Sequence, residues 1–342
     1  MANIVTALST IYEVDMKAGK LKESMLKRSV LKQLHTRNKD VIAAPSVGGD
    51  YGAMSITDEM AVVLSSDPVT LTADAIGSSA IIAACNDVAC SGATPTGVTA
   101  TLLLPTSFNE DELKRLMKDL DEACQSCGVD IISGHTEVTR AVKEPVVVVT
   151  AMGTISKEKL LLSGNIKPGM DIVATKWVAL EGTAILACEK EDELRTRYAQ
   201  PFIDNAKVFR QMMSILPEAA VATKSGASAM HDVSEGGVFG ALWELAESAG
   251  VGLEIDLKKI PIRQETIEIC EFFDLNPYKL LSGGCLLIAT EDGNGLVMEL
   301  EKADIPAVII GKATDNNDRV LINEDERRFL ETTQTDELYR IK

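Results

Sequence analysis

Four aspartates in this sequence stand beside small residues at the ends of apolar segments, where a carboxylate can reach a bound ligand. They are Asp50, Asp67, Asp87 and Asp232. Any one of them is more often a simple turn cap than a ligand. Taken together they predict a hard-cation site, because magnesium prefers oxygen donors and commonly bridges phosphates.

The pair Asn86-Asp87 lies in the middle of a nearly apolar stretch, Thr72 to Pro95. A buried helix should not carry an adjacent amide and carboxylate without partners, because an unpaired buried charge costs several kcal/mol or becomes neutral. One interpretation is that these side chains face a solvated edge or cap a neighbouring element. The other is that they reach a metal ion or phosphate at an otherwise dry site.

Two glycine-rich segments accompany these aspartates. Gly48 and Gly49 immediately precede Asp50, and glycines let a backbone turn sharply or approach a ligand closely. The segment is not a P-loop, since it lacks the GK[ST] ending, and an ordinary turn is the alternative. Upstream, the lysines of GKLKES either lie on a solvated surface helix, which we favour, or contact a phosphate.

The second segment, MHDVSEGG, runs from Met230 to Gly237 directly into an apolar helix expected over residues 238–249. Free backbone N–H groups and the helix dipole make such a helix N-terminus an anion-binding site. Asp232, Ser234 and the two glycines would form it. The simpler alternative is an ordinary N-cap by Ser234.

The sequence contains three histidines, His35, His135 and His231, and they are not spaced as zinc ligands. His135 and His231 each precede an expected turn, so each is a candidate for proton transfer or for plain hydrogen bonding. No Ser-His-Asp set stands out. The histidines therefore do not define a reaction by themselves.

Composition excludes several classes of partner. The chain of 342 residues has a formal net charge of −17, so nucleic acid and anionic membrane surfaces are poor partners. No apolar run reaches the ~20 residues of a membrane span, and the N-terminus does not resemble a signal peptide. The seven cysteines lie mostly in core-like runs, which is typical of reduced thiols in a cytoplasmic protein.

Strand and helix patterns alternate through both halves, which predicts an α/β fold. The clearest helix spans residues 109–127, with a capping box of Asn109 and Glu112 and a stop at Gly128. A buried strand is expected from Met60 to Asp67, ended by Pro68. Residues 133–140, SGHTEVTR, are expected to form a polar turn, and a glycine/proline break near residues 156–168 marks a domain boundary.

Five segments, in this order and spacing, resemble the aminoimidazole ribonucleotide (AIR) synthase superfamily: GGDYGAM, LSSDP, CNDVACSGATP, SGHTEV and HDVSEGGVFGALWELAESAGVGLEID. The superfamily includes AIR synthase, selenophosphate synthetase, thiamine-monophosphate kinase and the hydrogenase maturation protein HypE. The similarity covers nearly the whole chain. Its overall pattern, including LSGGCLLIA and AVIIGKA near the end, is most similar to that of HypE.

The resemblance implies a two-domain α/β architecture. Residues 1–155 would form an N-terminal ATP-binding domain whose sheet pairs with that of a second subunit into a dimer barrel. Residues 165–342 would form the C-terminal domain. ATP and Mg²⁺ would bind in the cleft between the domains of a homodimer.

The resemblance also implies roles for individual residues. Asp50, Asp67 and Asp87 would be magnesium or phosphate ligands, and the far wall of the cleft would contain Asp232, Ser234, Gly236 and Gly237. Further contacts to the nucleotide would come from Gly48, Gly49, Asn86, Gly134, Thr136 and Glu137. The residues assigned to catalysis are Asp87, His135 and Asp232.

The chemistry implied is transfer of phosphate from ATP to an oxygen, often that of an amide or carboxamide, as in a ligase or phosphotransferase. HypE ends in a cysteine that carries the reacting group, whereas this chain ends Tyr339-Arg-Ile-Lys342. One alternative is therefore a nucleotide-binding maturation protein that works with a partner protein and has little turnover of its own. The other is a small-molecule kinase similar to thiamine-monophosphate kinase.

Overall fold

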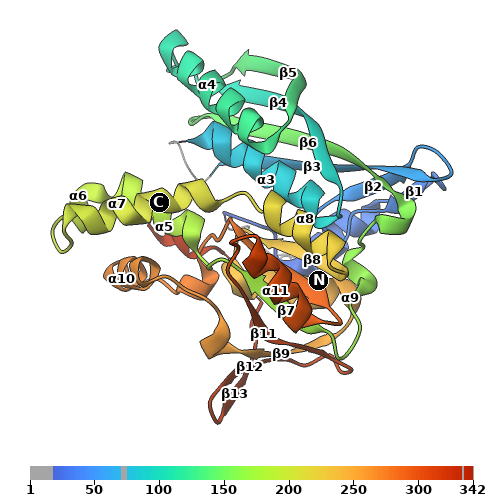
Figure 1. Cartoon of the computed structure of the whole chain (residues 1–342). Helices are drawn as coiled ribbons and strands as arrows, with labels where there is room; N and C mark the ends of the chain where they lie inside the picture. Colours follow the sequence, from blue (N-terminus) through green and yellow to red (C-terminus); the bar gives the residue numbers. More distant parts are fainter. Residues whose placement is uncertain (1–17, 71–74, 333–334, 342) are drawn as a thin grey trace, which may run out of the picture.

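The computed structural model describes residues 18–70, 75–332 and 335–341, and two α/β domains pack against each other in it (Figure 1). Each domain contains one mixed β-sheet, with six strands in the first and seven in the second. The two-domain α/β class expected from the sequence is confirmed. The start of the Thr72–Pro95 stretch, up to Asp74, lies outside the described residues.

The first sheet has the strand order β1-β2-β3-β6-β4-β5. Only the β4–β5 pair is parallel among its neighbouring strands. The strands are β1 (Val41–Ala43), β2 (Gly52–Ser55), β3 (Met60–Val69), β4 (Thr94–Leu104), β5 (Asp130–Val138) and β6 (Val146–Ser156).

Helix α3 (Ile76–Cys90) packs on this sheet and is buried on nearly all sides, because a neighbouring helix of the same domain and the second domain cover the sides that the sheet does not. Its small residues allow this close packing. A Cβ on Gly77 would lie 3.1 Å from the backbone nitrogen of Leu120 in α4 (Glu110–Cys127). Asp119 of α4 in turn accepts a hydrogen bond of 2.8 Å from the Ser78 N–H in the first turn of α3.

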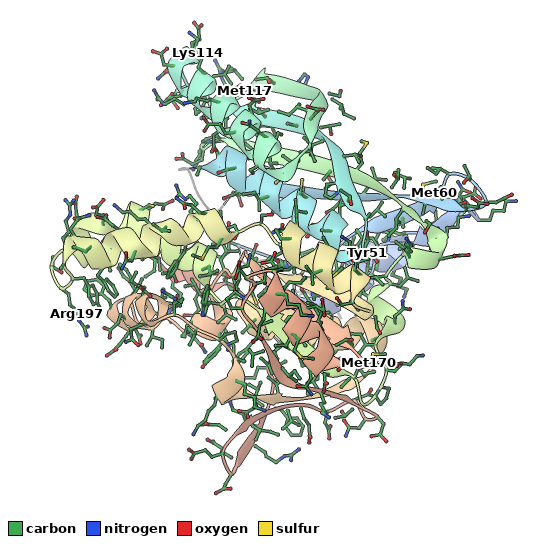
Figure 2. All side chains as sticks on the ribbon, in the orientation of Figure 1. Tyr51, Met60, Lys114, Met117, Met170 and Arg197 are labelled. Carbon is green, nitrogen blue, oxygen red and sulfur yellow. The ribbon has the colours of Figure 1, made fainter. Side chains whose placement is uncertain are left out.

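Helix α4 has the termini that the sequence predicts. The Asn109 side chain accepts hydrogen bonds from the N–H groups of Asp111 and Glu112, Glu112 completes the capping box, and Gly128 ends the helix with φ +69°. The outer face of α4 is solvated: Figure 2 shows Lys114 and Met117 projecting from it, away from the second domain.

Two predictions about the first sheet were wrong. Strand β3 continues through Pro68, which lies opposite Val148 of β6. Strand β2 pairs with β3 only as far as Leu64, so the other edge of β3 is open beyond that point and a proline without an N–H is tolerated there. The expected turn SGHTEVTR is mostly strand, because β5 runs unbroken from Asp130 to Val138 alongside β4.

The second sheet has the strand order β13-β12-β9-β11-β7-β10-β8. Its central strands, β7 and β10, are almost wholly buried. The strands are β7 (Asp171–Thr175), β8 (Ala227–Val233), β9 (Gly252–Asp256), β10 (Cys285–Thr290), β11 (Ala307–Thr314), β12 (Arg319–Asn323) and β13 (Glu326–Phe329).

The helices of the second half fall into two groups in Figure 1. One group lies against the second sheet: α8 (Leu216–Lys224), α9 (Gly237–Ala249) and α11 (Gly293–Lys302). The other forms a lobe at the left of the view: α5 (Leu180–Glu189), α6 (Glu191–Leu194), α7 (Gln200–Val208) and α10 (Gln264–Phe272). The helices α6, α7 and α8 and the strands β8, β12 and β13 were not expected from the sequence.

One of the apolar clusters spans both domains. Residues of α3 and β3 belong to the same buried cluster as Ile215, Met230 and Leu286 of the second domain. Tyr51, which Figure 2 places near the junction of the domains, donates its hydroxyl to the carbonyl of Leu161 in the connection between β6 and β7. Among the helices in the described part of the chain, none is long and apolar enough to cross a membrane.

Candidate functional site

All four aspartates singled out in the sequence line one cavity of about 440 Å³. Asp50 and Asp67 reach it from the first domain, at the start of β2 and near the end of β3, and Asp87 reaches it from α3. Asp232 comes from β8 of the second domain. The cavity therefore lies between the domains and has carboxylates from both.

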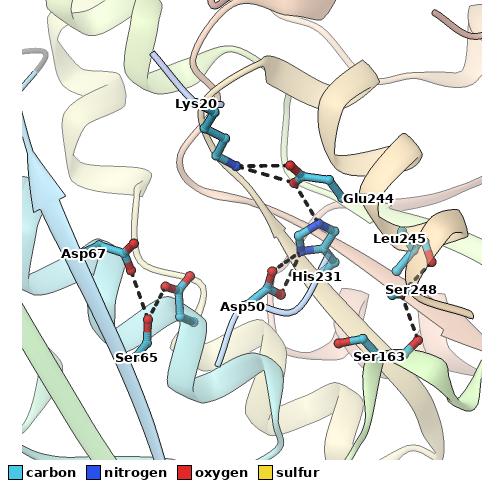
Figure 3. Close-up of polar contacts among 10 residues, drawn as sticks. Lys20, Asp50, Ser65, Asp67, Ser163, His231, Glu244, Leu245 and Ser248 are labelled. Atoms are coloured by element: carbon cyan, nitrogen blue, oxygen red, sulfur yellow. Dashed lines mark hydrogen bonds and ion pairs between the residues drawn. The ribbon is translucent and has the colours of Figure 1, made fainter. Parts of the chain in front are cut away.

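Asp67 and Asp87 meet at the hydroxyl of Ser65, which lies 3.0 Å from Asp67 and 2.6 Å from Asp87 (Figure 3). A serine hydroxyl has a single proton to donate, so it satisfies only one of the two carboxylates. Burial raises the pKa of Asp87 well above its ordinary value, and the charges of Asp232 and Asp67 add to this effect. The end of the cavity at Asp67 and Asp87 therefore has excess negative charge.

Asp50 pairs with His231 of β8, whose Nδ1 lies 2.6 Å from one carboxylate oxygen and 2.7 Å from the other. Asp232 follows His231 in the chain, and donor atoms of all three residues lie within 4.8 Å of one another. Burial raises the pKa of Asp232 to about 7, and the charge of Asp50 contributes. This group adjoins the Asp67–Asp87 pair in the same cavity.

On its other side, His231 faces Glu244 of α9, with 3.3 Å between Nε2 and a carboxylate oxygen. Glu244 also lies 3.4 Å from the Lys20 ammonium (Figure 3). Burial alone would lower the pKa of His231, but Asp50 and Glu244 raise it to about 10. Burial likewise opposes ionisation of Glu244, while Lys20 and His231 lower its pKa to about 2. Lys20, Glu244 and His231 therefore form a charged chain that ends on Asp50.

Lys20 is the lysine of GKLKES that lies at the cavity, and its backbone N–H donates to Glu235 at 2.9 Å. The sequence analysis favoured a solvated surface helix for this segment. The observed helix begins only at α2 (Glu23–Met25) and continues as a π turn, Leu26–Val30, and a 3-10 turn, Leu31–Gln33. Lys20 precedes these turns in a loop, which is how it reaches the cavity.

Asn86 occupies a different place from that expected of a nucleotide ligand. Its amide nitrogen donates to the Met213 carbonyl at 2.9 Å, and its amide oxygen accepts from the Ile215 N–H at 3.0 Å. Both groups of the buried amide thus bind backbone of the second domain, and Asn86 does not line the cavity. In the described structure this residue holds the two domains together beside Asp87.

The segment Gly134 to Glu137 is not at the cavity of this chain. It lies in β5, the outer edge strand of the first sheet, and all of its residues are exposed. His135 Nε2 is 3.5 Å from Glu137, and its side chain is 64% exposed. The expectation that Gly134, His135, Thr136 and Glu137 contact the nucleotide is therefore not met within one chain.

The glycine segments lie only partly where they were expected. Gly48, Gly49 and Ser234 line the cavity. The N-terminus of α9 is already occupied, because the Gly236 N–H donates at 2.7 Å to the buried carboxylate of Asp336. A Cβ on Gly237 would lie 2.6 Å from the Tyr278 carbonyl, so this glycine permits close backbone packing.

Ser234 makes no side-chain cap of α9, so the alternative of an ordinary N-cap is also wrong. The anion that this helix terminus binds in the described chain is a carboxylate of the protein itself. Asp336 lies about a hundred residues further along the sequence, and no local pattern around Ser234 indicates it.

Sequence reasoning missed three carboxylates of the cavity: Glu181 of α5, Glu244 of α9 and Glu235, which precedes α9. The first two stand within helices. The signal for Glu244 was a charged residue within the otherwise apolar helix VFGALWELA. Glu181 stands in the first turn of a similarly apolar helix, LEGTAILA. In both cases the sequence shows a charged residue within an apolar helix, but it does not show which residue that charge contacts.

Comparison with known proteins agrees with this architecture. Residues 48–155 match the AIR synthase related protein N-terminal domain, and residues 167–323 match the AIR synthase related protein C-terminal domain. A putative hydrogenase expression/formation protein of Methanocaldococcus jannaschii is 27% identical over 89% of this chain and 91% of its own length. Carbamoyl dehydratase HypE of Rhodobacter capsulatus is 27% identical over 72% of each chain.

Solved structures show the same fold. HypE of Escherichia coli superposes with a TM-score of 0.72 at 22% identity, covering 82% of this chain and 88% of that one. A thiamine-monophosphate kinase complexed with AMPPCP and TMP superposes with a TM-score of 0.71 at 18% identity, covering 94% and 99%. The chain therefore belongs to the AIR synthase related family, and its sequence relatives include HypE-like proteins.

Proposed function

We propose that this protein is an ATP- and magnesium-dependent enzyme of the HypE-like type, which transfers the terminal phosphoryl group of ATP to an oxygen of an amide, carboxamide or other small acceptor. The observation that carries the proposal is the convergence of Asp50, Asp67, Asp87 and Asp232 from both domains on one cavity. Relatives named carbamoyl dehydratase and thiamine-monophosphate kinase support the reaction class, and a solved structure of HypE in complex with ATP supports the nucleotide.

The donor set fits magnesium. Its ligands are carboxylate oxygens, and the raised pKa of Asp87 indicates negative charge that lacks a counter-cation. Asp50, Asp67 and Asp87 would hold Mg²⁺, which would neutralise charge on the nucleotide phosphates. Catalysis of phosphoryl transfer depends mainly on such neutralisation and on positioning.

The chain's own residues would do the positioning. His231 fixes the Asp50 carboxylate, and Ser65 sets the separation of Asp67 and Asp87. Lys20 adds an ammonium at the cavity wall beside Glu244. Asp232, with a pKa of about 7, is placed to exchange a proton at neutral pH.

A homodimer would give the exposed β5 segment a role. Its outer edge is unpaired among the described strands, and the side chains of Ile132 and Val138 on it are 58% and 60% exposed. Pairing of this edge with a second copy would bury them. The nucleotide of the partner subunit would then be contacted by Gly134, His135, Thr136 and Glu137. Within one chain these residues lie away from the cavity.

The second candidate is a nucleotide-binding maturation protein that acts with a partner protein. It is favoured by the likeness, with a TM-score of 0.71, to the HypE chain of a solved HypE–HypF complex. The two candidates differ in turnover. The first predicts phosphoryl transfer to a small molecule by the purified protein alone, and the second predicts little turnover until a partner is added.

The test is magnesium-dependent release of ADP by the purified protein with a panel of amides and small alcohols. The variants Asp87→Asn and Asp232→Asn should each lower the rate at least tenfold. Asp192→Asn in α6, whose side chain is 97% exposed and lies outside the cavity, serves as the matched control. Full activity in both cavity variants would contradict the assignment of the site.

A further inference from the structure

The cavity is elongated along one face of α3. Ser79, Ala83 and Asp87 all line it, and residues four apart lie on one face of a helix. Eight residues of helix correspond to a rise of about 12 Å. The four aspartates gather at the Asp87 end, whereas the Ser79 end contains a different group, the side chain of Glu181.

The carboxylate of Glu181 is held by contacts from three segments. Glu181 stands in the first turn of α5, Ser79 of α3 lines the cavity with it, and Gly283 approaches it from the loop before β10. A Cβ on Gly283 would lie 2.3 Å from its Oε2, so a glycine is needed for this approach. Ala83, Ile185 and Leu281 supply apolar walls around it.

This arrangement is costly for a carboxylate that has no further task. Burial raises the pKa of Glu181 to about 7, and the charges of Asp336 and Asp232 also raise it. The groups that bind it come from loops and helices that are otherwise apolar. None of the contacts in the proposed nucleotide site explains why a carboxylate stands at this end.

We propose that Glu181 binds an N–H group of the phosphoryl acceptor, so that the Ser79 end of the cavity is the acceptor subsite of the proposed enzyme. The inference rests on the proposed function and adds the residue that orients the acceptor. The dimensions agree. The path begins at a carboxylate bound to Mg²⁺ and continues through a phosphoryl group in near-attack contact with an amide. It ends at a second carboxylate that accepts the amide N–H, and its total length is roughly 12–14 Å.

An amide acceptor would be phosphorylated on its oxygen and deprotonated on its nitrogen. The amide N–H donates to Glu181 while the amide oxygen attacks the terminal phosphorus of ATP. A new P–O bond forms, the bond from that phosphorus to the bridging oxygen breaks, and ADP leaves with the electron pair. The proton of the amide nitrogen passes to the Glu181 carboxylate, and the products are an O-phosphorylated imidate and ADP.

The experiment compares binding of two probes to the protein saturated with Mg²⁺ and ADP, by ligand-observed NMR of their methyl signals. Acetamide has an N–H, and N,N-dimethylacetamide presents the same carbonyl oxygen without one. The wild type should bind acetamide at least fivefold more tightly. The Glu181→Gln variant should lose that preference, because it has an NH₂ group where the second carboxylate oxygen accepts.

Two further variants make the result specific. Gly283→Ala displaces the carboxylate without removing it and should also abolish the preference. Glu189→Gln, in the last turn of the same helix and outside the cavity, should leave it unchanged. Calorimetric titration with Mg²⁺ and ADP should give dissociation constants within twofold of wild type for all variants, which shows that they are folded.

The outcomes separate the two proposals. A preference for acetamide retained by Glu181→Gln, or absent from a wild type that binds Mg²⁺ and ADP, overturns the acceptor subsite and leaves the nucleotide site standing. A wild type that binds no nucleotide overturns the proposed function, and the subsite with it.

Discussion

Asp50 of the first domain and His231 of the second form a buried ion pair, with 2.6 Å between a carboxylate oxygen and Nδ1. The side chain of Asp50 is 7% exposed and that of His231 is 4% exposed. The pair therefore links the two walls of the cavity at the point where a metal ligand is expected. It also explains why a histidine directly precedes Asp232, since His231 holds Asp50 while Asp232 lines the cavity.

Replacing His231 by glutamine should destabilise the protein by about 3–5 kcal/mol, because breaking a buried ion pair leaves an uncompensated charge. Two carboxylates, Asp50 and Glu244, would lose their shared cation. Urea unfolding measures the loss. The control is His35→Gln, at an exposed position where the substitution should change stability by less than about 0.5 kcal/mol. Equal stability of the two variants would contradict the pairing.

The same pair predicts a pH dependence at alkaline pH. The pKa of His231 is raised to about 10 in the folded chain, against about 6.5 when unfolded. The stability that protonated His231 contributes is fully present below about pH 6.5. It is lost as the pH rises through about 10, because between these two pKa values the folded state binds one proton more than the unfolded state. Unfolding free energies measured between pH 7 and 10 should fall less steeply in His231→Gln than in the wild type. Parallel slopes would show that His231 is not charged in the folded protein.

Asp87→Asn should stabilise the protein in the absence of magnesium. The folded-state pKa of Asp87 lies above its unfolded value, so the wild type loses stability as the pH rises past the unfolded value. The variant removes that loss, and its melting temperature without Mg²⁺ should exceed that of the wild type by several degrees at pH 8 and by less at pH 5. Calorimetry at both pH values provides the measurement, with the exposed Asp192→Asn as control. A variant less stable than the wild type at pH 8 would show that Asp87 is stabilised as an anion.

Asn86→Leu should destabilise the protein by about 2–4 kcal/mol, because the Met213 carbonyl and the Ile215 N–H would be left buried without a partner. Unfolding followed by tryptophan fluorescence can measure the loss, since Trp177 and Trp243 both lie in the second domain. Gln125→Leu on the exposed face of α4 provides the control. If Asn86→Leu is as stable as that control but binds nucleotide weakly, Asn86 is a nucleotide ligand and the interdomain contact is secondary.

How far the sequence predicts this structure depends on the range of each interaction. Helix α4 was predicted with its cap and its stop because Asn109, Glu112 and Gly128 act on backbone within a few residues. The family was identified from motifs, and the aspartates that these motifs contain do converge. Residues 133–138 of β5 were not recognised as strand because they are exposed at a sheet edge, and a strand that is not half-buried lacks the alternating apolar pattern.

The polar network of the site was beyond sequence reasoning for another reason. Lys20 and Glu244 are 224 residues apart, and Gly236 and Asp336 are 100 residues apart. Each residue has an ordinary local environment in the sequence and acquires its role only when the chain is folded. The contacts that Asn86 and the α9 N-terminus make within this chain could not be predicted for the same reason, since the groups that they bind come from distant segments.

The most direct test of the central claim is calorimetric titration of the wild-type protein with ATP, with and without magnesium. The account predicts micromolar binding that weakens at least tenfold when Mg²⁺ is removed, because the carboxylates of Asp50, Asp67, Asp87 and Asp232 repel bare phosphates. Binding of equal strength without magnesium, or no binding at millimolar ATP, would contradict it.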